Sequence, residues 1–227
     1  MFLALTLVAT IGFVALGVWQ LERRVWKLDL IARVDSRIHA PPAPLPPPDR
    51  WAAVNDRDDA YRRIRTTGTF LHDRETLVQA LTERGAGFWV VTPFQTGQGV
   101  VLVNRGFVDE AHRDPHTRTL GQVAGAVTVT GLLRITEPRG GFLRSNQPAS
   151  DRWYSRDVAA ITARRGLGQA APFFLDADAT PNPGGWPVGG LTVVSFYNQH
   201  LAYALTWFGL ALLSAFGFTR VLRRSPA

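Results

Sequence analysis

Hydrophobic residues gather in two long runs near the chain ends, with shorter apolar stretches between them. The first run, residues 2–18, reads FLALTLVATIGFVALGV and carries no charge. The second has no charged residue from Leu201 to Thr219. At about 1.5 Å per residue, helices of this length cross a hydrocarbon core of about 30 Å. The pattern therefore predicts transmembrane helices at residues 2–19 and 199–219.

The first run lacks the marks of a cleaved signal peptide. It has no basic segment before it, and no small-x-small cleavage site follows before WQLERRVWK. We therefore expect an uncleaved anchor, with Trp19 and Trp26 near the membrane interface. Two spans place both termini on the same side of the membrane.

Basic residues near the membrane set the expected orientation. Residues 220–227 form a basic tail with Arg220, Arg223 and Arg224, which predicts cytoplasmic termini and an extracytoplasmic middle. Arg23, Arg24 and Lys27 follow the first span and argue for the opposite orientation. We give more weight to the tail, and interpret the earlier cluster as kept for a partner.

Residues 20–48 are predicted to form a helical extension and a proline-rich linker. Between Glu22 and Ile38 the apolar residues recur at spacings of three and four, which favours a helix that continues the first span. The run PPAPLPPPD, residues 41–49, ends it, because proline lacks an amide donor and restricts the residue before it. Such a run favours an extended spacer.

Residues 49–198 are predicted to form a β-rich extracytoplasmic domain. A helix is expected at 157–167, capped by Asp157 and ended by Gly166 or Gly168. The fold class that follows is a membrane protein of the α+β class: two transmembrane helices flank a strand-rich antiparallel domain, a small barrel or sandwich with one or two helices. Alternating or β-branched runs predict strands at 61–70, 76–81, 88–94, 100–108, 127–136, 173–178 and 191–197.

Charge and cysteine content exclude several classes of protein. The chain has 25 Lys and Arg against 18 Asp and Glu, a net charge of +7. Its arginines are scattered, and the cluster after the second span is explained by membrane orientation, so we do not expect nucleic-acid binding. With no cysteine, disulfides, thiolate nucleophiles and cysteine-ligated metals are excluded.

The middle of the chain has few residue patterns that are typical of catalysis or metal binding. No Gly-rich phosphate loop, HExxH or GxSxG motif occurs, so we do not expect an enzyme. His112, Asp114 and His116 indicate either a weak metal site or a solvated turn, and the turn is favoured because the ligand set is incomplete. Asp176 and Asp178 resemble half a calcium loop, and a turn is again favoured.

Two polar interruptions of apolar runs leave alternatives open. Asn104-Arg105-Gly106 interrupts a strand, and predicts either a bulge or hairpin edge or an Arg105 that faces a partner or a propionate. His200, Tyr203 and Trp207 share one helix face at i, i+3 and i+7. His200 is then either an interfacial residue or an axial haem ligand.

Three stretches together resemble a known family. They are LGVWQLERRVWK (16–27), VTPF…VLVNRGFV (91–108) and YNQHLAYALTWFGLA (197–211). In this order they are similar to the signatures of the surfeit locus protein one family, the cytochrome c oxidase assembly factors. The resemblance implies two membrane helices around a domain outside the bacterial inner membrane. It also implies haem a received from haem A synthase and inserted into the oxidase catalytic subunit.

The resemblance also assigns residues. The proposed haem-ligand histidine of the second-span motif matches His200, and the tryptophan of the first-span motif matches Trp19. Tyr203 and Trp207 would add aromatic surface for haem a. Arg23, Arg24 or Arg105 would contact its propionates or a partner. The alternative is a membrane scaffold that stabilises oxidase assembly intermediates without binding haem.

Overall fold

The fold is described from a computed structural model, which covers residues 2–141, 143–192, 194 and 196–224. The chain forms two compact units. One contains the terminal segments 1–35 and 194–227, and the other contains residues 36–193. We call them the helical unit and the β domain, and describe each by itself.

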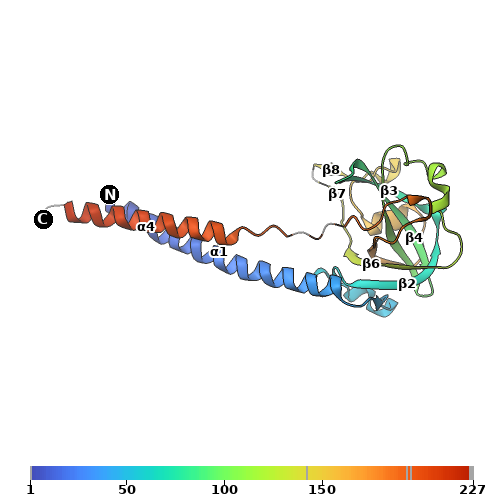
Figure 1. Cartoon of the computed structure of the whole chain (residues 1–227), viewed down its shortest axis with the longest axis horizontal. Coiled ribbons are helices and arrows are strands. Elements are labelled where there is room, and N and C mark those ends of the chain that lie inside the picture. Colours follow the sequence, from blue (N-terminus) through green and yellow to red (C-terminus); the bar gives the residue numbers. More distant parts are fainter. Residues whose placement is uncertain (1, 142, 193, 195, 225–227) are drawn as a thin grey trace. The chain divides into compact units, whose positions relative to one another are not determined.

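The helical unit contains helices α1 (Phe2–His39) and α4 (His200–Arg224), labelled in Figure 1. Both are long and apolar enough to cross a membrane. The helix predicted at 22–38 is confirmed, and it is continuous with the first apolar run because no proline or glycine interrupts the junction.

The two helices of this unit run antiparallel and pack through small and polar residues. Thr10 donates a hydrogen bond to Ser214 over 3.0 Å. A Cβ placed on Gly17 would lie 2.5 Å from the ring of Phe208, so only glycine permits this approach. Small residues at such contacts let helix backbones come close, which favours association in lipid.

Strands dominate the β domain, as predicted. Its two short helices are α2 (Asp56–Asp59) and α3 (Val158–Arg164). Asp157 caps α3 by accepting from the Ala160 amide over 3.1 Å, and Gly166 follows the helix with φ +60°, as expected. The strands are β1 (Ala43–Pro44), β2 (Arg63–Phe70), β3 (Thr76–Thr82), β4 (Gly85–Thr96), β5 (Gly99–Val108), β6 (Val127–Ile135), β7 (Gly140–Gly141), β8 (Arg144–Ser145) and β9 (Ala170–Ala177).

Five of these strands close into a small barrel. Strand β2 pairs with β6 on one side and with the end of β4 on the other, which closes the ring β2–β6–β9–β5–β4. All ring pairs are antiparallel except β5–β9. A Cβ on Gly131 would lie 2.4 Å from the carbonyl oxygen of Asp176, so this crossing of β6 and β9 requires glycine.

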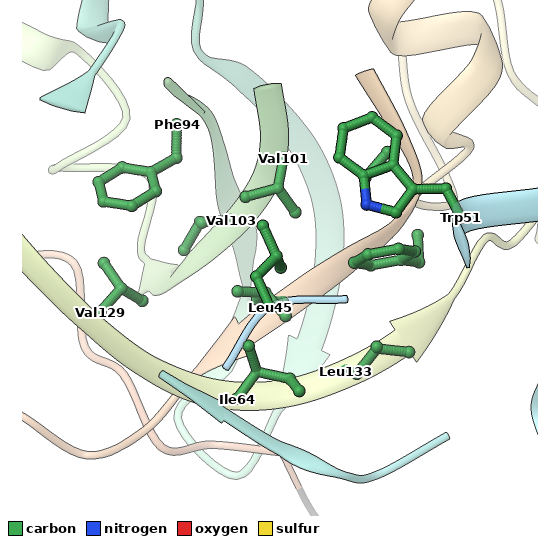
Figure 2. Close-up of a cluster of buried hydrophobic side chains, with 11 residues drawn as sticks. Leu45, Trp51, Ile64, Phe94, Val101, Val103, Val129 and Leu133 are labelled. Carbon is green, nitrogen blue, oxygen red and sulfur yellow. The ribbon is translucent and has the colours of Figure 1, made fainter. Parts of the chain in front are cut away.

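Apolar side chains fill the barrel at every second residue of its strands. Figure 2 shows this cluster, in which Val101 and Val103 of β5 lie with Ile64, Phe94 and Leu133. Side chains of the other parity point outward. Leu102 and Phe174 form a second cluster under α3 with Trp153, Val158 and Ile161. Strand β5 is therefore buried on both faces, which explains its nearly continuous apolar sequence.

Two predictions about the borders of the β domain are wrong. The proline-rich run is extended but is not an isolated spacer, since β1 pairs in parallel with β2 and Leu45 is buried in the barrel. The strand predicted at 191–197 does not form at its described residues, and residues 193 and 195 lie outside the description. Both edges of β9 are already paired, so the preceding strand offers no place for it.

The turn predicted at Asp176 is also wrong. Asp176 lies within β9 and is 2% exposed. Its carboxylate accepts hydrogen bonds from Asn104 over 2.7 Å, Arg134 over 2.8 Å and Arg156 over 3.0 Å. Two guanidiniums and an amide thus make it possible to bury this charge inside a strand.

Candidate functional site

The polar residues Asn198, Gln199 and His200 stand at the start of the apolar helix α4, and two of them make hydrogen bonds typical of a helix start. The carboxamide oxygen of Asn198 accepts from the His200 amide over 3.4 Å, and the Gln199 carbonyl accepts from the Tyr203 amide over 3.2 Å. The Asn198 bond satisfies an amide that has no partner within the helix, and the Gln199 bond is the first i to i−4 bond of α4. The imidazole of His200 takes no part in them.

The imidazole of His200 is instead bound by the other helix of its unit. Nδ1 of His200 lies 2.7 Å from the side-chain oxygen of Gln20 on α1. An amide oxygen only accepts, so Nδ1 is the donor of this hydrogen bond, and in the neutral ring the lone pair lies on Nε2. Among residues 2–141, 143–192, 194 and 196–224, Nε2 has no hydrogen-bond partner. The contact with Gln20 therefore orients the ring so that Nε2, rather than Nδ1, is the nitrogen without a partner among the described residues.

The predicted aromatic residues divide into two groups. Trp207 stacks on Phe13 of α1, with ring centroids 5.8 Å apart and an interplanar angle of 22°. Tyr203 and Trp19 are 53% and 50% exposed on their helices. The structure thus brings His200 and Trp207 onto the α1 side of α4, and leaves the other two aromatic side chains open to the surroundings of the helices.

Cations of the helical unit lie over aromatic rings. The Arg23 guanidinium lies 4.5 Å from the ring of Trp26, and the Lys27 ammonium lies 4.9 Å from the ring of Phe196. Arg24 is half-buried. Cations held against rings in this way keep hydrogen-bond donors available for an anion.

Arg105 does not face outward. It is 2% exposed and donates to the Gly121 carbonyl and, over 3.1 Å, to the side chain of Asn182. Strand β5 has one residue more than β4 at this point, which is the predicted bulge. Gly106 in the bulge has φ +131°, a conformation open to glycine. The prediction that Arg105 faces a partner or a propionate at the surface is therefore corrected: its guanidinium is covered and binds groups of the β domain.

A buried polar cluster surrounds Arg105. His72 Nε2 lies 3.1 Å from the Val123 carbonyl, and Nδ1 lies 3.4 Å from a nitrogen of Arg105. Burial lowers the pKa of His72 below 6.5, the Val123 hydrogen bond works against it, and the charge of Arg105 lowers it further. Desolvation likewise lowers the pKa of Arg105 to about 10. Glu75 pairs with Arg118 beside them.

Next to this cluster the β domain has a cleft of about 790 Å³. Aromatic and charged side chains line it, among them His72, His116, Arg152, Trp153 and Tyr154. In the part of the chain that the structure describes, the Arg152 guanidinium and the His116 ring have no hydrogen bond or ion pair. Sequence reasoning missed this cleft, because its lining comes from distant segments.

The histidine pair of the loop after β5 does not converge. His112 Nδ1 lies 2.7 Å from a carboxylate oxygen of Asp109, and its ring stacks on Trp186 with centroids 4.1 Å apart. The Asp114 side chain instead caps the turn at the His116 amide over 2.9 Å. This is the arrangement of the predicted turn, and within the described ranges no group of three or more His, Asp or Glu side chains is placed to hold a metal.

Comparison with known proteins places these features in a family. Residues 7–212 match the SURF1 family, a range that contains all three stretches of the resemblance. The chain belongs to the SURF1 family. Surfeit locus protein 1 of Rattus norvegicus is 38% identical over 93% of this chain and 72% of its own length. The Homo sapiens protein is 38% identical over 93% and 74%, and a SURF1-like protein of Monosiga brevicollis 39% over 88% and 79%.

The SURF1 match begins within α1 and ends within α4, so it includes the whole β domain and part of each apolar helix. Gln20 is the residue of the helical unit that sequence reasoning missed. A signal was present, because Gln20 ends the first apolar run and His200 begins the second. In two antiparallel spans these positions lie at the same level, where isolated polar side chains tend to pair.

Proposed function

We propose that this SURF1-family protein is a cytochrome c oxidase assembly factor that binds haem a and assists its insertion into the oxidase catalytic subunit. The observation that carries the proposal is the His200 ring, whose Nδ1 is bound to Gln20 and whose Nε2 has no partner among the described residues. A neutral imidazole in this state is a haem ligand of the common type. Haem A synthase would be the donor of the haem.

The residues around His200 fit an apolar ring with acidic side chains. Trp19 and Tyr203 offer exposed aromatic surface on apolar helices, and Trp207 is fixed by its stacking on Phe13. Arg23 and Arg24 supply cations for propionates on the same unit. A single imidazole ligand suits a carrier, since its one bond to the iron is exchanged when the haem leaves.

The proposed setting is the bacterial inner membrane, with α1 and α4 spanning it. The Arg220 and Arg223 tail would be cytoplasmic by the positive-inside rule, and the β domain would be extracytoplasmic. The polar ends of the two spans, Gln20 and His200, would then lie near the outer face of the bilayer. The test is a reporter fusion: alkaline phosphatase inserted in a β-domain loop is expected to be active, and the same enzyme after residue 227 inactive.

The decisive experiment is the visible spectrum of the detergent-purified protein made together with haem A synthase. The wild type is expected to carry haem a, and His200→Ala is expected to lose it. His116→Ala is the matched control, because it removes an exposed ring from the β domain. A colourless wild type made beside an active synthase would refute the carrier function.

A scaffold that stabilises oxidase assembly intermediates is the second candidate. The observation in its favour is the β-domain cleft of about 790 Å³, whose lining includes Arg152 and the aromatic side chains Trp153 and Tyr154. Such a lining suits a protein segment. A scaffold would remain colourless, and would lose its association with the oxidase subunit on Arg152→Glu rather than on His200→Ala.

A further inference from the structure

We infer that Gln20 is the positioning residue of His200: it fixes the proton on Nδ1 and orients the ring so that Nε2 is the nitrogen presented for ligation. The inference is built on the 2.7 Å contact between Nδ1 of His200 and the side-chain oxygen of Gln20. It deepens the proposed function and rests on it where the iron is concerned. The statement about the ring itself holds for the haem-free protein.

The packing of the helical unit brings Gln20 to this place. The contacts of Thr10 with Ser214 and of Phe13 with Trp207 join α1 to α4 over successive turns. Gly17 lies against Phe208 one turn before Gln20, so the helices are close where the polar pair forms. The pairs Phe13–Trp207 and Gln20–His200 are separated by about two turns on both helices, so the same antiparallel register accounts for both contacts.

No other side chain in the described residues is bonded to the imidazole of His200. Asn198 accepts from the backbone amide of His200, and Gln199 is exposed. The choice of tautomer therefore depends on Gln20. A neutral imidazole has one protonated nitrogen and one with a lone pair. An oxygen that accepts a hydrogen bond from one ring nitrogen fixes the proton there and leaves the other nitrogen for a metal.

The chemical consequence is an oriented and more basic ligand. Histidines that bind metals usually donate their second ring N–H to a carboxylate or carbonyl oxygen, which fixes the ring and strengthens the ligand. Loss of such a partner typically costs about 10–100-fold in metal affinity. Gln20 supplies a neutral oxygen of this type from the neighbouring helix, and the contact is partly buried.

Three variants test the inference. Gln20→Leu removes the acceptor, and Gln20→Glu retains an oxygen and adds charge. Gln199→Leu is the matched control, because it makes the same substitution at an exposed position beside His200. The first readout is the ¹⁵N NMR spectrum of the histidine rings in haem-free, full-length protein in detergent, with the His200 signals assigned by their absence from His200→Ala.

We expect the wild type and Gln199→Leu to show His200 protonated at Nδ1 alone, and Gln20→Leu to show a mixture of both tautomers. In the haem-loaded protein, Gln20→Leu should weaken haem a binding about 10–100-fold. Gln20→Glu should retain it and raise the iron–histidine stretching frequency in resonance Raman spectra. A merely structural role for Gln20 would change stability in both variants and leave this frequency unchanged.

The outcomes separate the two proposals. If Gln20→Leu has the tautomer of the wild type, the positioning role is refuted whether or not haem binds. If the tautomer changes as expected but the wild type takes up no haem a from the synthase, the positioning role stands and the carrier function fails. If Gln20→Leu does not fold, Gln20→Glu still decides, because its carboxylate should keep the proton on Nδ1 and raise the iron–histidine frequency. A proton found on Nε2 in the haem-free variant, or an unchanged frequency in the haem-loaded one, would overturn the inference.

Discussion

Asp176 offers the sharpest test of how the barrel is held together. Its side chain is 1% exposed and bridges β9 to three other segments through Asn104, Arg134 and Arg156. Asp176→Asn conserves shape and removes the charge. It leaves the Arg134 guanidinium without its carboxylate and leaves Arg156 with Glu137 alone.

The size of the effect follows from which charges lose their partners. Removing one partner of a buried ion pair costs about 3–5 kcal/mol, because the remaining charge stays in a medium of low polarity. Arg134 and Arg156 have side chains that are 19% and 14% exposed, so water relieves little of this. For a domain of 150–250 residues each kcal/mol lowers the Tm by about 2–4 °C, which gives a loss on the order of 10 °C.

The assay is thermal unfolding of full-length protein in detergent, followed by tryptophan fluorescence and circular dichroism. Asp73→Asn is the matched control, since that carboxylate is 77% exposed and its Arg74 contact is 3.8 Å long. We expect a change within about 0.5 kcal/mol there. If Asp176→Asn unfolds within about 2 °C of the wild type, the network does not stabilise the barrel and the reasoning is refuted.

Three further predictions concern other parts of the molecule. Burial, with Arg105 nearby, lowers the pKa of His72, so the unfolded chain binds a proton at a higher pH than the folded protein does. The free energy of unfolding should therefore fall as pH drops through 6.5, and urea titrations of His72→Gln should show a smaller fall. An identical pH dependence in wild type and His72→Gln would contradict the prediction. In a chain without cysteine, Thr10→Cys with Ser214→Cys should form an intramolecular disulfide, seen as faster migration on non-reducing gels, because the two hydroxyl oxygens are 3.0 Å apart. Adding Gly17→Val should lower the yield of that disulfide, since its Cβ would meet Phe208 at 2.5 Å, whereas Gly12→Val, with nothing within 4 Å, should not.

The hydrophobic pattern predicted most of the fold because burial is periodic along the chain. The strand at 100–108 and the helix after Asp157 were found within a few residues of their bounds. The proline-rich run was misjudged for the opposite reason. Its composition describes local stiffness, and only the closed barrel shows that Leu45 has a core to enter.

Candidate site residues were harder to predict, because a polar residue in an apolar run has two explanations with the same local signature. The sequence alone therefore leaves two explanations for Arg105 and for His200, and it favours a turn at Asp176 because the two arginines that pair with it lie far away in sequence. Pairing information resolves such cases. The positions of Gln20 and His200 at the ends of their apolar runs indicate that the two residues could pair, but only the register of α1 against α4 shows that they do.

Whether every hydrogen-bonding atom of a polar side chain has a partner helps to distinguish a structural residue from a candidate metal ligand. A guanidinium has only donors. The two terminal nitrogens of Arg105 are directed at the Gly121 carbonyl, Asn182 and His72, which ties β5 to the segments around it, while Nε is buried without a partner among the described residues. An imidazole has a donor and an acceptor. At His72 both ring nitrogens have partners, Val123 and Arg105. At His200 one nitrogen is bound by Gln20 and the other has no partner among the described residues, in a unit that exposes many apolar and aromatic side chains. Of these two histidines, His200 alone has a ring nitrogen without a protein partner among the described residues, and this difference is why we propose the haem chemistry in the helical unit rather than in the barrel.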